Sequence, residues 1–247
     1  TTYWATDGVP LSGYGYPVKP VGLICSVFRP SDDATIYPFL IPANYFAVVA
    51  LKQAAELLNK ILKNNKLALE CSELALEVEK ALLQHAIIKH QTYGRIFAYE
   101  VNGFGSFNLM DDANVPSLLS LPYLGAVKNT DPVYVNTRKY LLSTNNPFFF
   151  KGKAAEGIGG PHAGMNMIWP LSVTMRGLTS TNAAEVTQCL HSLKLTHGGT
   201  GFMHEAFHKD DASNFTRKWF AWANTLFGEL VMQTSEKQPQ ILTQNPI

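Results

Sequence analysis

The sequence predicts a mostly helical protein, all-α apart from one small β-hairpin. Apolar residues recur at the spacing of a buried helical face in a series of segments, which predicts the helices; the segments are residues 43–62, 67–90, 115–124, 132–143, 165–179, 183–195 and 216–233. A second observation concerns domain organisation. No low-complexity tract or flexible linker separates these segments, so residues 1–247 are expected to form a single domain.

The first elements follow an extended, Pro- and Gly-rich opening over residues 1–42. The helix predicted over residues 43–62 ends at Asn64-Asn65, and the second predicted helix runs from Leu67 to His90. Gly94 ends the helical pattern. Residues 95–110 are predicted to form a short β-hairpin, because Asn102-Gly103 is a strong turn dipeptide.

The later helices are separated by long loops. Asp112 is suited to cap the helix predicted over residues 115–124, and Pro116 suits its first turn. Residues 145–161 are predicted to be irregular. The helices pair through alternating short polar turns and long loops rich in Gly, aromatic and acidic residues, so helical hairpins would gather the long loops at one rim.

His204, Glu205 and His208 match the zinc-peptidase pattern H-E-x-x-H, which requires a helix to bring both imidazoles to one metal. Three glycines precede His204 closely, and the polar run 209–214 follows His208. Glycine disfavours a helix and Asp, Ser and Asn favour caps. We therefore expect an ordered loop that presents Glu205, with a new helix near Asn214. A zinc peptidase with Glu229 as third ligand remains the alternative enzyme hypothesis.

The composition excludes several function classes. A formal net charge of +1 provides no basic field, so no nucleic-acid partner is expected. Apolar stretches are interrupted well short of the roughly 20 residues that a membrane span requires, so no membrane partner is expected. Cys25, Cys71 and Cys189 are odd in number and widely spaced, which predicts buried free thiols. No targeting segment is visible. The sequence does not distinguish a cytoplasmic from a periplasmic protein, and it does not indicate the oligomeric state.

Acidic and aromatic residues in four loops carry the candidate chemistry; the loops are residues 28–37, 111–114, 157–170 and 204–205. Paired aspartates can be plain helix caps. Beside Arg, Pro and aromatic residues, however, their pKa values are readily perturbed, as acid–base catalysis requires. Glycoside cleavage needs one neutral carboxylic acid and one carboxylate, and Trp169, Tyr37 and Phe202 offer flat faces for sugar rings.

Longer motifs make the interpretation specific. They are Phe28-Arg-Pro-Ser-Asp-Asp-Ala34, the run from Leu109 to Gly125, Gly157-Ile-Gly-Gly-Pro-His162, Met203-His-Glu-Ala-Phe-His-Lys-Asp-Asp211, Asn214-Phe-Thr-Arg217 and the run from Trp219 to Glu229. Together they resemble glycoside hydrolase family 125 over nearly the whole chain. The resemblance implies an exo-acting, inverting α-1,6-mannosidase on an (α/α)6 toroid, with an α-mannoside or oligosaccharide substrate, no catalytic metal and no cofactor.

The resemblance also implies roles for individual residues. Glu205 is the expected general base, and Asp32 the expected general acid, with Asp33 left open as the alternative acid. The matched motifs place further residues around the substrate: Arg29, Asp111, Asp112, Asn114, His162, Trp169 and His204. Inversion implies that the two carboxyl groups lie about 6.5–9.5 Å apart, with room for a water molecule.

One departure from the family concerns length. Members of the family are longer, and the helices that precede Thr1 are expected to be missing, so the toroid is expected to be incomplete in this chain. Twelve helices of average length do not fit into 247 residues together with long loops. A non-catalytic glycan-binding fragment therefore stands as a further alternative to both enzymes.

Overall fold

A computed structural model describes residues 8–244 of the chain. The chain forms two compact units. The first unit contains the residues before Asp111 together with Pro116–Arg138, and the second contains Asp111–Val115 and the residues after Arg138. Both units combine helices with small antiparallel sheets, so the protein is helix-rich, as predicted, but has more strands than the single hairpin expected.

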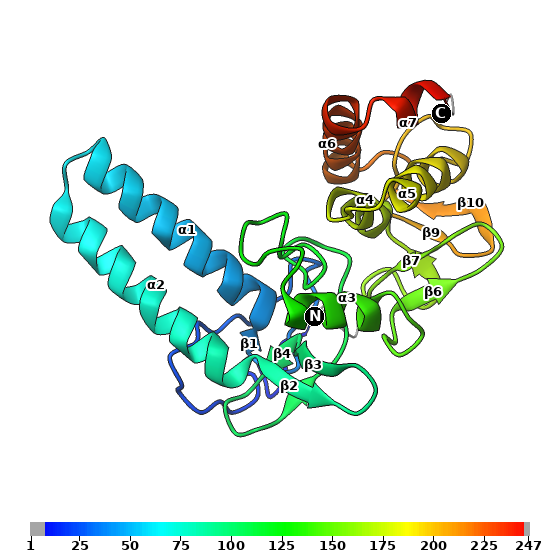
Figure 1. Cartoon of the computed structure of the whole chain (residues 1–247). Coiled ribbons are helices and arrows are strands. Elements are labelled where there is room, and N and C mark those ends of the chain that lie inside the picture. Colours follow the sequence, from blue (N-terminus) through cyan, green and yellow to red (C-terminus); the bar gives the residue numbers. More distant parts are fainter. Residues whose placement is uncertain (1–7, 245–247) are drawn as a thin grey trace. The chain divides into compact units, whose positions relative to one another are not determined.

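The first unit is built on a pair of long antiparallel helices, α1 (Ile41–Lys60) and α2 (Asn65–His85), which lie side by side in Figure 1. Pro42 occupies the first turn of α1, where its missing N–H costs no hydrogen bond. The side chain of Asn64 caps α2 by accepting a hydrogen bond of 3.1 Å from the Leu67 amide. The bounds of α1 and the start of α2 were predicted within two residues.

Two small sheets continue the first unit. β2 (Ile87–His90) and β3 (Gly94–Phe97) form a hairpin, while β1 (Phe39–Leu40), β4 (Glu100–Val101) and β5 (Phe107–Asn108) form a sheet in the order β1-β4-β5. The turn predicted at Asn102-Gly103 does connect two strands, β4 and β5. Gly103 has a φ of +78°, and a side chain there would meet the Lys19 carbonyl.

Two predictions in this unit were wrong. The helix expected to reach His90 ends at His85, because Ile87 and Ile88 enter the β2–β3 hairpin. Residues 115–124 form turns rather than a helix. Ser117 and Ser120 hydrogen-bond each other's backbone there, and such local side-chain bonds compete with helix formation. α3 (Pro132–Leu141) follows, as predicted.

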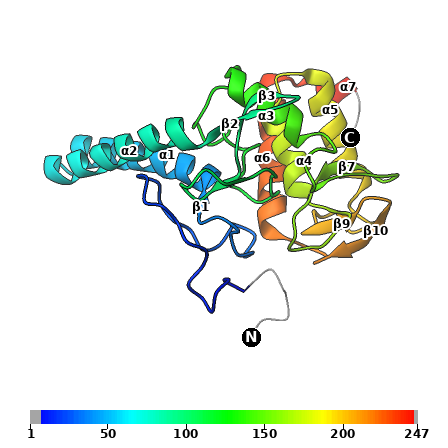
Figure 2. The ribbon, with the colours of Figure 1, turned by 90° about the horizontal axis from the view of Figure 1, so that it is seen from below.

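The second unit packs α4 (Pro170–Leu178) against both α5 (Ala183–Leu195) and α6 (Ala221–Lys237), an arrangement that can be followed in Figure 2. Nearly every residue of α4 is buried, so this short helix forms the centre of the unit. α7 (Gln240–Gln244) packs on α6. α5 has its predicted bounds, with the Asn182 side chain as its N-cap.

Five short strands complete the second unit. β6 (Phe149–Lys151) pairs with β7 (Glu156–Ile158), and β8 (Met167–Ile168), β9 (Ala206–His208) and β10 (Asp211–Thr216) form a sheet in the order β10-β9-β8. The helix expected from residue 165 begins at Pro170 because β8 precedes it. The helix expected from residue 214 begins at Ala221, since Asn214 lies in β10.

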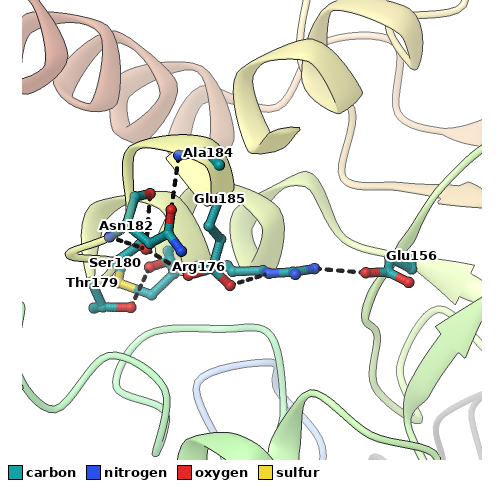
Figure 3. Close-up of polar contacts among 8 residues, drawn as sticks. Glu156, Arg176, Thr179, Ser180, Asn182, Ala184 and Glu185 are labelled. Atoms are coloured by element: carbon teal, nitrogen blue, oxygen red, sulfur yellow. Dashed lines mark hydrogen bonds and ion pairs between the residues drawn. The ribbon is translucent and has the colours of Figure 1, made fainter. Parts of the chain in front are cut away.

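A charged cluster links β7, α4 and α5, as Figure 3 shows. Arg176 donates from Nε to Glu185 Oε1 at 2.8 Å and from Nη1 to Glu156 Oε1 at 3.0 Å. The other oxygen of Glu185 accepts a hydrogen bond of 2.5 Å from the Ser180 hydroxyl. One guanidinium therefore neutralises two carboxylates that are largely removed from water.

The three cysteines are free thiols, as predicted, but only Cys189 is buried and Cys25 is exposed. Among the helices of residues 8–244, none combines the length and the apolar character that crossing a membrane would require.

Candidate active site

The loop that carries Asp32 and Asp33 is a tight hairpin in the first unit. Arg29 and Asp33 close it: the Asp32 amide donates to the Arg29 carbonyl at 3.1 Å, and the Arg29 amide donates to the Asp33 carbonyl at 2.8 Å. Pro30 suits the second position of such a turn, and Asp32 takes the left-handed conformation with a φ of +69°. Asp is among the few residues other than Gly that tolerate this conformation.

The two aspartates occupy different environments. The side chain of Asp32 is exposed at the tip of the hairpin, whereas Asp33 is fully buried. A residue other than glycine held at positive φ is often found where function requires a particular side-chain direction. Asp32, the favoured candidate, and Asp33, the alternative, therefore differ in their exposure to solvent.

Arg29 is buried beneath this hairpin. Its Nε donates to Glu100 Oε1 at 2.7 Å, and its guanidinium lies 5.4 Å from the centre of the Tyr99 ring. Arg29 Nε is thus paired with a carboxylate of the protein, and the expected contact of Arg29 with substrate stays a prediction.

Glu205 lies in the second unit, at one end of the β10-β9-β8 sheet. It directly precedes β9, while Trp169 directly follows β8 and Arg217 directly follows β10. β9 is antiparallel to both neighbours, with Ile168 paired to Phe207 and Thr216 paired to Ala206. The start of β9 and the ends of β8 and β10 therefore share one edge of the sheet, so these three residues are neighbours by topology.

The Glu205 carboxylate is nearly buried and has a cationic partner. Arg217 Nε lies 3.2 Å from Glu205 Oε1, and the Arg217 guanidinium lies 5.7 Å from the centre of the Phe220 ring. Arg217 itself has a φ of +41°. Asn224 fixes the backbone two residues before Glu205, since its side chain accepts from the Met203 amide and donates to the Met203 carbonyl.

His204 is fully buried and stacks on Phe215, with ring centres 3.7 Å apart and planes nearly parallel. Its Nδ1 lies 3.0 Å from the Lys218 carbonyl oxygen, which can only accept, so Nδ1 carries a proton. Nε2 is buried and has no hydrogen-bond partner among residues 8–244. In the neutral ring this nitrogen is an acceptor, and a buried acceptor without a partner is costly.

A second acidic loop packs closely on the glycine-rich segment. Asp112 Oδ1 accepts from the Asn114 amide and from Asn114 Nδ2, at 3.1 and 2.9 Å. A side chain on Gly160 would lie 3.2 Å from that same oxygen, so the glycine permits the approach. The neighbouring Ala113 amide donates to the Gly159 carbonyl at 3.0 Å.

The remaining predicted residues lie in the same unit. The Asp111 amide donates to Asn146 Oδ1 at 3.4 Å. Trp169 is buried, with its ring centre 6.0 Å from that of Phe220 and 6.2 Å from that of His162. Trp169 Nε1 is another buried group without a hydrogen-bond partner in the part of the chain that the structure describes.

The zinc-peptidase alternative fails on geometry. Residues 204–208 contain no helical turn, and His208 lies in β9, where it pairs with Met167 and Asp211. Four residues of strand span about 13 Å, against about 6 Å in a helix, so His204 and His208 are not presented to one metal ion. No group of three or more His, Cys, Asp or Glu side chains suited to a metal occurs within residues 8–244.

The second unit thus contains Glu205 with Asp111, Asp112, Asn114, His162, Trp169 and His204, and the first unit contains Arg29 with Asp32 and Asp33. Sequence reasoning assigned no role to Glu100 or Arg217, which contact Arg29 and Glu205. Arg217 falls in a motif, but its contact depends on a strand that was not predicted. Glu100 carried no sequence signal beyond lying upstream of Asp111.

Acidic side chains held beside Arg and aromatic rings are compatible with glycoside cleavage, and the comparison with known families gives the class of protein, a glycoside hydrolase. The family model of the metal-independent α-mannosidases, glycoside hydrolase family 125, matches residues 1–232. The chain therefore belongs to glycoside hydrolase family 125.

Individual relatives are longer than this chain. The Meiotically up-regulated gene 157 protein of Schizosaccharomyces pombe is 45% identical over 245 residues, which are 97% of this chain and 47% of that protein. The chain thus spans about half the length of this relative. A metal-independent α-mannosidase from Streptococcus pneumoniae, in a non-productive complex with α-1,6-mannobiose, is 38% identical with a TM-score of 0.93 over 96% of this chain and 56% of that one.

A bacterial glucoamylase complexed with acarbose is also similar in structure, with a TM-score of 0.64 at 17% identity. The match covers 85% of this chain and 36% of that one. At this identity the comparison shows a shared fold only.

Proposed function

We propose that the protein is an inverting, exo-acting glycoside hydrolase that releases terminal α-1,6-linked mannose from mannosides and N-glycan-type oligosaccharides. The observation that carries the proposal is the similarity, over 96% of the chain, to a metal-independent α-mannosidase whose structure contains α-1,6-mannobiose. Asp32 is the proposed general acid, with Asp33 as the alternative, and Glu205 is the proposed general base.

In this mechanism Asp32 donates a proton to the glycosidic oxygen as the bond to the mannose C1 breaks. Glu205 accepts a proton from a water molecule that attacks C1 from the opposite face. Arg217 Nε, 3.2 Å from Glu205 Oε1, supplies a cation beside the proposed base. The exposed position of Asp32 at the hairpin tip supports its role as the group that meets the leaving oxygen.

Substrate contacts are proposed for the other residues of the matched motifs. His204 Nε2 offers an acceptor and Trp169 Nε1 offers a donor, and neither is satisfied within residues 8–244. A sugar hydroxyl can both donate and accept, so bound mannose would satisfy either group. Arg29, Asp111, Asp112, Asn114 and His162 stay candidates for substrate contacts.

We further propose that the helices of both units belong to one (α/α)6 toroid domain, which is incomplete in this chain. Apolar side chains on the long hairpin support this proposal. Leu69, Leu76 and Leu83 recur at intervals of seven along α2, and each is about half exposed or more. α1 carries a similar exposed stripe of Phe46 and Leu57, with Ile61 just beyond its end. Exposed stripes at helical spacing are typical of surfaces that further helices cover.

The proposal is tested by incubating the protein with α-1,6-, α-1,3- and α-1,2-linked mannobiose and measuring released mannose. Cleavage of the α-1,6 isomer alone is expected. Glu205→Gln is expected to abolish turnover and leave mannobiose binding within about twofold. Mannobiose binding without hydrolysis by the unsubstituted protein would favour the non-catalytic glycan-binding alternative, and preference for another linkage would contradict the proposed specificity.

A further inference from the structure

Glu100 is a fully buried carboxylate to which the proposed mechanism assigns no role. Its two oxygens accept four hydrogen bonds. Oε1 accepts from Arg29 Nε at 2.7 Å, and Oε2 accepts from the Ile36 amide at 3.2 Å, the Tyr37 amide at 3.4 Å and Asn108 Nδ2 at 3.1 Å. Burying a charge is costly unless it is paired and hydrogen-bonded, and these partners meet that requirement.

The donors lie on both sides of the aspartate hairpin. Arg29 is at the start of the turn, while Ile36 and Tyr37 follow Asp33 by a few residues. The Glu100 carboxylate therefore links the two strands of the hairpin, the one before the turn through Arg29 and the one after it through Ile36 and Tyr37. The hairpin also has backbone hydrogen bonds of its own, from the Arg29 amide to the Asp33 carbonyl and from the Thr35 amide to the Val27 carbonyl, so Glu100 adds a side-chain link to them.

Glu100 is itself held rigidly. It lies in β4, the central strand of its sheet, where it pairs with Leu40 of β1 and Asn108 of β5. The Tyr99 ring lies against the guanidinium of Arg29 and restricts that side chain further. Through Glu100, the hairpin is therefore anchored to the β1-β4-β5 sheet.

We propose that Glu100, acting through Arg29 and the Ile36 and Tyr37 amides, is a positioning residue that fixes the direction in which the hairpin presents its catalytic acid. The inference rests on the proposed function. It holds for either aspartate, because Asp32 and Asp33 are both part of the hairpin. Misplacing a catalytic group by about 1 Å can cost on the order of 100-fold in rate.

Glu100→Gln tests the proposal with minimal change in shape. The amide removes the charge opposite Arg29, and its NH2 group cannot accept from the Ile36 and Tyr37 amides if its oxygen stays on Arg29. The diagnostic readout is dependence on the leaving group. α-1,6-Mannobiose needs a proton on its leaving oxygen, whereas 2,4-dinitrophenyl α-mannoside releases a stable anion and needs none.

We expect Glu100→Gln to lower kcat/KM for α-1,6-mannobiose roughly 100-fold and for 2,4-dinitrophenyl α-mannoside by less than about threefold. Glu100→Asp, which keeps the charge, should recover part of the loss. Glu79→Gln is the matched control, because Glu79 lies in the same unit and forms an exposed ion pair with Lys52. It should leave both rates unchanged.

Equal loss on both substrates would overturn the proposal, because a general structural defect does not depend on the leaving group. If the unsubstituted protein cleaves neither substrate, the proposed function fails independently. Amide hydrogen exchange then tests the anchoring alone. Glu100→Gln should speed exchange at Ile36 and Tyr37 at least tenfold and leave α1 unchanged, and unaltered exchange at those amides would equally overturn it.

Discussion

Arg176 offers a stability prediction whose magnitude follows from the cluster in Figure 3. Arg176→Met keeps much of the apolar stem but leaves Glu156 and Glu185 without their shared cation. Removing one partner of a buried ion pair costs about 3–5 kcal/mol, whereas exposed pairs are worth about 0–1 kcal/mol. The side chain of Arg176 is 15% exposed and those of Glu156 and Glu185 are 24% and 17% exposed, so these groups stand nearer the buried limit. We expect a loss of about 2–3 kcal/mol in the free energy of unfolding.

Urea denaturation followed by tryptophan fluorescence measures this loss. Three of the four tryptophans, Trp169, Trp219 and Trp222, lie in the second unit, so the signal reports mainly on the unit that contains Arg176. Lys209→Met is the control, because Lys209 forms a more exposed pair with Asp210. It should cost no more than about 1 kcal/mol.

The loss should also depend on pH. Burial alone would raise the pKa of Glu156, but hydrogen bonds and charge from Arg176 and Lys151 outweigh it and hold the pKa below its ordinary value of 4.5. A carboxyl group with a lowered folded pKa stabilises the protein fully above its unfolded pKa and loses that contribution as the pH falls through the folded value. The difference between the native protein and Arg176→Met should therefore be constant near neutral pH and shrink below about pH 4.5. A difference under about 1 kcal/mol at pH 7, or one that grows on acidification, would refute the reasoning.

The remaining predictions concern the site and its scaffold. Asp32→Asn, which the left-handed backbone tolerates, should reduce α-1,6-mannobiose hydrolysis by a factor of about 100 or more while sparing 2,4-dinitrophenyl α-mannoside; the same pattern in Asp33→Asn instead would assign the acid to Asp33. Gly159→Ala should destabilise the protein by about 3 kcal/mol in urea denaturation, because its methyl group would overlap the Met167 carbonyl oxygen and the Phe150 ring. Gly228→Ala, with open space around the added methyl group on α6, should instead stabilise by up to about 1 kcal/mol, and equal effects of the two alanines would contradict the packing argument. Asn224→Ala should lower kcat on mannobiose without changing the leaving-group dependence, because it frees Met203 beside the base; an unchanged kcat would count against that role.

The sequence predicted those elements whose signals are local. α5 was predicted with its bounds from its apolar spacing, and in the structure Asn182 caps it. α1 and the start of α2 were predicted from the same spacing. The strands were missed because β8, β9 and β10 are only 2, 3 and 6 residues long, and pairing between residues 168 and 207 leaves no periodic trace. Residues 115–124 have the apolar pattern of a helix, but hydrogen bonds between Ser117 and Ser120 accompany turns there instead.

The site shows the same division. Motifs proposed Glu205 and the aspartate pair as candidates, which stay predictions. The rejection of a helix around His204 was correct, because glycine and cap residues disfavour one. The different environments of Asp32 and Asp33 depend on one positive φ angle, which no residue type encodes uniquely. Glu100 and Arg217 act through contacts between residues distant in sequence or across an unpredicted sheet, so only the structure shows them.

Proton NMR of the mannose first released from α-1,6-mannobiose tests the central claim most directly. If Asp32 or Asp33 protonates the leaving oxygen while Glu205 activates water on the opposite face, the product must appear as β-mannose before mutarotation. Initial release of α-mannose would require a covalent intermediate and a nucleophilic carboxylate. That result would contradict the assignment of Glu205 as a general base.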